Sequence, residues 1–281
     1  MKIAEIFIIL CATFSLLALP CAAQNDSVSL AHGGLSASNY NMQNPKERAF
    51  MIAIGAANVL DTYISAEQYK GTEIRIMAEN RSRISPRHLS HTFTHHGCLS
   101  ILDNRAGNGN ELAGAYRFQF SLHYNWILSP NFSLQVGGCT DAKLGILYNT
   151  RNSNNPVQAD ISLHLAPSAS ISYKNTFRHR SFLIRYHLST PLVGLMFSPN
   201  YGQSYYEIFS KGNYDHNIVP TTFVSAPSLH HALTLDVQLS PKKPRSKLRL
   251  GYLGDIQQSN VNNIKRHHYT HSFLIGWVHH L

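Results

Sequence analysis

Apolar and polar residues alternate strictly in several stretches of this 281-residue chain. In the clearest stretch, 116–126, Tyr, Phe, Leu and Trp fill the even positions, and Arg, Gln, Ser, His and Asn fill the odd ones. A period of two places the two sets on opposite faces of a β-strand. A run of 11 residues is long enough for a tilted strand to cross a bilayer, whereas soluble strands usually stop at about five or six.

The same alternation recurs along the chain, with turn residues between the runs. Together they predict ten strands, at 49–57, 69–79, 88–102, 112–128, 131–148, 158–174, 180–197, 229–239, 246–257 and 266–281. In an alternative with twelve strands, 201–209 and 219–224 form a further hairpin. A soluble sandwich with its polar face outward would also alternate, but repetition at spanning length favours an all-β fold, a transmembrane antiparallel up-and-down β-barrel of about ten strands.

An even number of strands returns both ends of a barrel to one side of the membrane. The short turns at 129–131, 175–176 and 241–244 are expected on this periplasmic side. The loops at 58–68, 103–111, 149–157, 198–228 and 258–265 are then expected outside the cell.

The last predicted strand carries Tyr269, Phe273, Ile275 and Trp277 on one face, and the sequence ends at Leu281. This pattern resembles the C-terminal assembly signal of outer-membrane barrels, with Leu281 in place of a final aromatic residue. The resemblance implies that the barrel-assembly machinery is a partner of the chain.

The N-terminus combines a basic start, an apolar run at 6–19 and Pro-Cys-Ala-Ala at 20–23. These are the parts of a secretory signal peptide, and the run is shorter than the roughly 20 residues of a spanning helix. A lipoprotein signal with a lipidated Cys21 is the alternative, which Pro20 disfavours. We expect a signal peptide at 1–23, an N-terminal periplasmic segment at 24–48 and the barrel at 49–281.

Charged residues make up 14% of the chain, against about 25% in ordinary soluble domains, as a lipid-facing exterior requires. The net charge of +9 comes from scattered basic residues, which disfavours nucleic acid as a partner. The expected partners are outer-membrane lipid and lipopolysaccharide, together with an unknown extracellular or periplasmic partner.

The segment at 55–65, Gly-Ala-Ala-Asn-Val-Leu-Asp-Thr-Tyr-Ile-Ser, is followed at 69–75 by Tyr-Lys-Gly-Thr-Glu-Ile-Arg. This opening resembles that of a family of Bacteroidota outer-membrane β-barrel proteins catalogued as a domain of unknown function. The resemblance covers about 49–281. It implies a barrel in the outer membrane and no particular activity.

The strand assignment points one set of charged side chains into the lumen, because each would cost a few kcal/mol if it faced lipid near the midplane. The set comprises Glu73, Arg75, Arg117, Asp141, Lys143, Asp160, Arg185, Asp236 and Arg249. A barrel of about ten strands is narrow enough for such side chains to fill it. We therefore expect a packed polar lumen, with a small selective pore lined by the four arginines as the alternative.

Removal of the signal peptide leaves Cys98 and Cys139 in an oxidising compartment, and the sequence leaves open whether they form a disulfide. The chain has 17 histidines, including His91 and His95 on one strand face. No carboxylate or cysteine accompanies them at a diagnostic metal-ligand spacing. We expect no metal and no cofactor.

No Gly-x-Ser-x-Gly motif is present, and we expect a non-enzymatic protein. The alternative, an outer-membrane hydrolase with its site near the extracellular rim, rests on two sets of residues. One is Asp215 and His216 with Asp103 and Asp255; the other is His123 or His187 with Ser121 or Ser189. The predicted contact surface is the loop at 198–228, because exposed aromatics on a long loop favour recognition; these are Tyr201, Tyr205, Tyr206, Phe209 and Tyr214.

Overall fold

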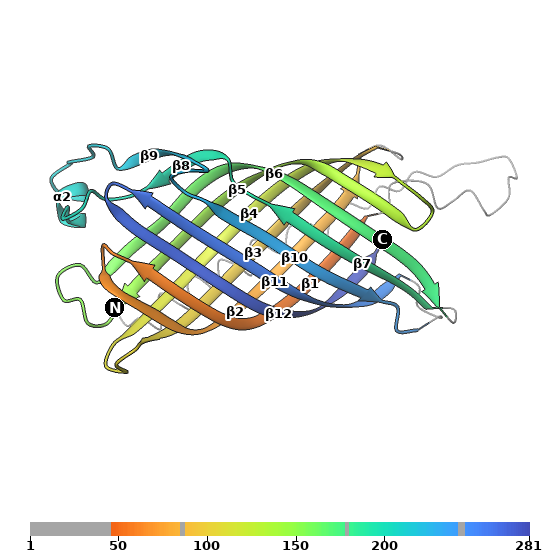
Figure 1. Ribbon diagram of the computed structural model, residues 1–281, viewed down its shortest axis with the longest axis horizontal. Helices are drawn as coiled ribbons and strands as arrows, with labels where there is room; N and C mark the ends of the chain where they lie inside the picture. Colours follow the sequence, from red (N-terminus) through yellow and green to blue (C-terminus); the bar gives the residue numbers. More distant parts are fainter. Residues whose placement is uncertain (1–45, 85–87, 178–179, 241–244) are drawn as a thin grey trace, which may run out of the picture. The chain divides into compact units, whose positions relative to one another are not determined.

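The structure is a computed structural model that describes residues 46–84, 88–177, 180–240 and 245–281, all within one compact unit, Asn41–Leu281. Ten long antiparallel strands form a closed wall (Figure 1). They are β1 (Glu47–Asp61), β2 (Ser65–Arg83), β3 (Leu89–Asn104), β4 (Asn110–Ile127), β5 (Phe132–Asn149), β6 (Val157–Phe177), β7 (Arg180–Ser189), β10 (Ser228–Val237), β11 (Ser246–Val261) and β12 (Ile264–His280). Pairing of β1 with β12 closes the sheet. The prediction of a ten-stranded antiparallel barrel is confirmed.

The strands are staggered around the wall. Following the paired residues once around, from Asn175 on β6, leads back to Leu163 on the same strand, a shear of 12 residues. In a barrel of ten strands, such a stagger corresponds to a strand tilt of about 40°. The tilt brings side chains from distant strands to the same height in the lumen.

Two short strands, β8 (Val193–Phe197) and β9 (Ile218–Thr222), add to the wall. β8 pairs with β6 beyond the point where β7 stops, and β9 pairs with β8. The predicted continuous strand at 180–197 is therefore wrong at 190–192, where Pro191 lacks the N–H that a ladder needs. In the alternative with twelve strands, the strand at 201–209 is wrong, because Tyr205–Phe209 forms helix α2, which begins with a capping box of Ser204 and Glu207. The strand at 219–224 of that alternative overlaps β9.

The outer wall is apolar. Large apolar side chains such as Phe50, Ile52, Ile54, Phe273 and Ile275 are exposed along it, while their neighbours in the alternation point inward. An extensive exposed apolar surface is typical of a wall that faces lipid. The described residues contain no helix that is long and apolar enough to cross a membrane.

The turns at one end of the barrel are shorter than predicted. β1 and β2 are joined at 62–64, and β11 and β12 at Asn262 and Asn263, which both have positive φ, as a two-residue hairpin turn requires. Both turns lie within the predicted loops at 58–68 and 258–265, which were drawn too long because the flanking strands of 15–19 residues exceed the roughly 10 needed to span a bilayer. We name this the loop end, and the opposite end, where Glu47 pairs with His280, the terminal end.

Of the predicted domain boundaries, only the start of the barrel lies within the described residues. β1 begins at Glu47, so the barrel starts two residues before the predicted boundary at 49. The predicted signal peptide at 1–23 and nearly all of the predicted segment at 24–48 lie outside the described residues.

Part of the inner wall is apolar, which corrects the expectation of a wholly polar lumen. One buried cluster lines β1, β2, β11 and β12 and consists of Ala49, Met51, Ala53, Met77, Leu253, Leu274 and Val278. A second lies near the loop end and includes Tyr69, Leu102 and Leu147. The charged side chains fill the space between these apolar walls.

Candidate functional site

Five side chains from five strands meet across the middle of the lumen, and we name them the central layer: Arg75, Arg117, Asp141, His230 and Asp255. Arg75 Nη1 lies 3.3 Å and Arg117 Nη1 3.2 Å from Asp255 Oδ2. Arg117 also pairs with Asp141, and His230 Nδ1 is hydrogen-bonded to Asp255 Oδ1. Asp255 therefore holds two arginines and a histidine together.

Glu73 anchors the central layer to one side of the barrel. The strand period that points Arg75 inward also points Glu73 inward, and its carboxylate lies 2.7 Å from Arg75 Nη2. Ser100 Oγ donates to the other carboxylate oxygen at 3.0 Å, and His268 Nε2 lies 3.3 Å from it. Glu73 is fully buried. This saturation of a buried carboxylate fixes the position of Arg75.

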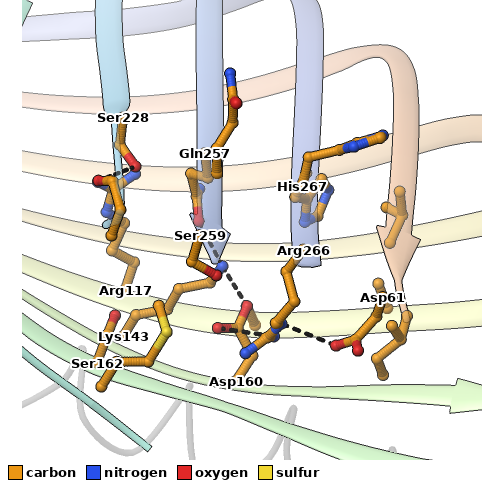
Figure 2. Close-up of a pocket in the computed structure, with 18 of the residues that line it drawn as sticks. Asp61, Arg117, Lys143, Asp160, Ser162, Ser228, Gln257, Ser259, Arg266 and His267 are labelled. Carbon is orange, nitrogen blue, oxygen red and sulfur yellow. Dashed lines mark hydrogen bonds and ion pairs between the residues drawn. The ribbon is translucent and has the colours of Figure 1, made fainter. Parts of the chain in front are cut away.

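A second group, the loop-side layer, lies between the central layer and the loop end. Figure 2 shows Asp160 between Lys143 and Arg266, and Arg266 reaching on to Asp61. Arg266 Nε is 2.8 Å from Asp61 Oδ2, and Lys143 Nζ donates to Gln257 Oε1 at 2.7 Å. The layer connects β1, β5, β6, β11 and β12.

A third group, the terminal layer, is built around Arg249, of which 1% is exposed. Its Nε and Nη2 donate to Asp236 at 2.6 and 2.8 Å, and Nη2 donates to Glu47 at 2.7 Å. Glu79 is 3.4 Å away, and Arg185 pairs with Glu47 at 3.4 Å. One arginine thus meets carboxylates from three other strands.

The spaces between the layers include a cavity of about 70 Å³ toward the loop end and one of about 110 Å³ toward the terminal end. Arg117 and His230 line both cavities, so the central layer separates them.

The structure places all nine predicted lumen charges inside the barrel, and each has an ion-pair partner. The partners that the prediction did not include are Glu47, Glu79, His230, Asp255, Arg266 and His268, and Arg266 pairs in turn with Asp61. The alternation carried a signal for several of them: Glu79 shares the parity of Glu73 and Arg75 on one strand. Glu47 and Asp61 were missed because the predicted first strand was too short at both ends.

The disulfide that the sequence left open is not formed, because Cys98 and Cys139 are both free. They lie on β3 and β5, with β4 between them. Strands two positions apart are separated by roughly 9–10 Å, beyond the limit of about 7 Å between the Cα atoms of a disulfide.

The residues of the hydrolase hypothesis do not come together as it requires. Asp215 and His216 form a 2.6 Å pair with side chains 74% and 79% exposed, whereas Asp255 is buried in the lumen rather than at the outer end of its strand. Asp103, at the loop end, accepts a hydrogen bond from Asn110.

The second set of the hypothesis is also not formed as expected. His123 Nε2 is hydrogen-bonded to Ser168 Oγ at 2.7 Å rather than to Ser121, and its ring contacts that of His187, with centroids 6.2 Å apart. In the described ranges, no group of three or more His, Cys, Asp or Glu side chains is arranged to hold a metal ion.

The insertion at 198–217 is anchored to the loop end by Tyr205. Its hydroxyl donates to Gln158 Oε1 at 2.6 Å and accepts from the backbone N–H of Ala159 at 2.7 Å. Burial raises the pKa of Tyr205 to about 12, so the hydroxyl stays protonated and keeps donating at any ordinary pH. Tyr63 adds a second anchor, donating to the carbonyl of Gln203 at 2.9 Å.

The other predicted contact residues of this insertion lie on its free surface. Tyr201, Tyr206, Phe209 and Tyr214 are each more than 60% exposed, and Lys211 Nζ lies 5.6 Å from the centre of the Tyr206 ring. The structure therefore divides the predicted set into one anchor and four exposed aromatics.

The apolar outer wall and the charged lumen define a transmembrane β-barrel. The chain belongs to the family described as "Protein of unknown function (DUF3316)", whose model matches residues 6–281. The predicted resemblance is confirmed at the level of a family without a known function, and the Bacteroidota lineage stays a prediction. No curated protein sequence matches the chain.

Several solved structures are similar to this chain in fold. The outer-membrane protease OmpT of Escherichia coli has a TM-score of 0.46 at 5% identity, over 86% of this chain and 98% of its own. The transport unit of the autotransporter AIDA-I from Escherichia coli has a TM-score of 0.41 at 8% identity, over 87% and 93%. An outer-membrane channel from Pseudomonas putida F1 has a TM-score of 0.40 at 7% identity, over 88% and 100%. At these identities the likeness carries no information on activity.

Proposed function

We propose that this protein is a sealed, non-enzymatic outer-membrane barrel that acts through contacts made at its loop end. The observation that carries the proposal is the lumen, which the central layer divides into cavities of about 70 and 110 Å³. A porin-like function needs a continuous aqueous path, whereas buried ion pairs join these layers across the lumen.

The location in the outer membrane rests on the apolar wall and on the export signal at 1–23 that the sequence predicts. A chain that crosses a membrane only with strands must close them into a barrel, as this chain does. The barrel-assembly machinery, outer-membrane lipid and lipopolysaccharide belong to the proposal as partners, together with an unidentified macromolecule outside the cell. The Bacteroidota origin belongs to it in the same way.

The contact surface of the proposal is the insertion at 198–217. Exposed aromatic side chains supply large contact areas with little loss of conformational entropy on binding, and four of them lie on this segment. The anchors at Tyr63 and Tyr205 hold the segment in place before any partner binds, which lowers the entropic cost of association.

The sealed lumen predicts that purified protein in planar bilayers gives no channel openings above the lipid baseline. The physical reason is that an ion would have to displace the ion pairs of the central layer. Single-channel recording, with a porin in the same lipid as the positive control, tests this. Regular openings by the wild-type protein would favour the small selective pore.

The proposal places the loop end outside the cell. We therefore expect a cysteine introduced there, Tyr206→Cys, to be labelled in intact cells by a membrane-impermeant maleimide. Lys46→Cys, at the terminal end, serves as the matched control and should react only after the outer membrane is permeabilised. The native Cys98 and Cys139 face the lumen, so the wild-type protein should stay unlabelled. Labelling of Lys46→Cys but not Tyr206→Cys in intact cells would reverse the proposed orientation.

A further inference from the structure

The cavity of about 110 Å³ between the central and terminal layers has a strongly cationic lining. Its wall includes Arg81 and Arg185 together with His96, His123 and His187, and its acidic residues are Glu79 and Asp255. We propose that this cavity binds a small tetrahedral oxyanion, with inorganic phosphate as the test ligand.

Arg81 and Arg185 have fewer and longer polar contacts than Arg249. Arg249 has four contacts with carboxylate oxygens, three of them of 2.6–2.8 Å. Arg81 has Glu79 at 3.6 Å and Gln135 at 3.5 Å, and Arg185 has Glu47 at 3.4 Å and Glu79 at 3.9 Å. Among the described residues, no hydrogen-bond partner is found for the buried Nε atom of either arginine.

Both guanidinium groups lie within 4 Å of the same Glu79 oxygen, so they are close neighbours in the cavity wall. Two guanidinium groups that border the same cavity suit the oxygens of a phosphate group, because each guanidinium can donate two parallel hydrogen bonds. An anion held between them would also offset their mutual repulsion.

Three histidines complete the wall of the cavity. Both ring nitrogens of His96 are buried and have no hydrogen-bond partner in the described part of the chain, and a buried polar group without a partner is costly. The rings of His123 and His187 lie against each other. These imidazoles can donate to an oxyanion.

Arginines outnumber carboxylates in the cavity wall itself. The wall carries Arg75, Arg81, Arg117, Arg185 and Arg249 against Glu79 and Asp255. A space of about 110 Å³ accommodates several waters or one tetrahedral oxyanion.

The test is to refold the full barrel in detergent with sodium phosphate or with sodium chloride at equal ionic strength, so that access to the cavity is not limiting. Loss of the folded band in a heat-modifiability gel then gives the midpoint temperature. We expect a saturable rise of a few degrees with phosphate alone. Arg81→Gln and Arg185→Gln should each weaken the apparent affinity about tenfold.

Arg151→Gln is the matched control, because this exposed arginine lies at the loop end, outside the cavity wall, where it contacts Asn108 and Glu67; it should keep the full shift. If Arg185→Gln fails to refold, Arg81→Gln decides, since its two contacts are long. An equal rise in chloride and phosphate, or a phosphate shift that survives in the Arg81→Gln protein, would overturn the proposal.

Discussion

Replacing Arg249 with Met is expected to lower the free energy of unfolding of the barrel by about 3–5 kcal/mol. Arg249 faces Asp236 and Glu47 at hydrogen-bonding distance, and all three are more than 90% buried. Removing the arginine leaves the buried Asp236 uncompensated and Glu47 with only its longer contact to Arg185, and methionine restores volume but no charge. Urea titration of the refolded protein in micelles, followed by the change in gel mobility, measures the loss.

Two further variants separate this electrostatic reason from a general effect of substitution. Arg151→Met removes an exposed arginine and should change stability by less than about 1 kcal/mol. Combining Arg249→Met with Asp236→Asn should regain part of the loss, because one uncompensated charge is then removed. The explanation fails if Arg249→Met unfolds at the same urea concentration as the wild-type protein.

Much of this barrel follows from the alternation of residues alone. The period of two in β4 and β6 determines which side chains face inward. The free-energy cost of burying a charged side chain there is lower when it pairs with an opposite charge from another strand. For this reason the nine charges predicted for the lumen lie there. The partners were harder to predict, because pairing depends on the shear of 12 residues that brings Asp255 of β11 level with Arg117 of β4. Shear is a property of closure and leaves no local sequence signal.

The insertion at 198–217 was the part of the barrel that was hardest to predict from the sequence. Tyr205 and Phe209 have the aromatic character of a strand, but Ser204 and Glu207 satisfy the first N–H groups of a helix turn. The hydrogen bonds that hold Tyr205 over β6 join residues 46 to 47 positions apart. Local propensity therefore missed both the helix and its anchor.

Removing the two side chains that line both cavities should open the lumen. In the variant that combines Arg117→Ala with His230→Ala, the central layer keeps Arg75 and Asp255, which still pair, so the barrel should fold. The space that the missing side chains occupied joins the two cavities. We expect discrete channel openings in planar bilayers where the wild-type protein gives none, with a preference for cations because Asp141 loses its pairing to Arg117 and faces the path.

A third substitution tests whether this preference arises from the exposed carboxylate. Adding Asp141→Asn to the double variant should leave the openings and reduce the selectivity for cations, measured as the reversal potential in a salt gradient. Ser162→Ala, in the wall of the smaller cavity, is the matched control and should stay silent, since it leaves the central layer intact. A double variant that migrates as a folded barrel but does not conduct would show that the loop-side or terminal layer, rather than the central one, forms the seal.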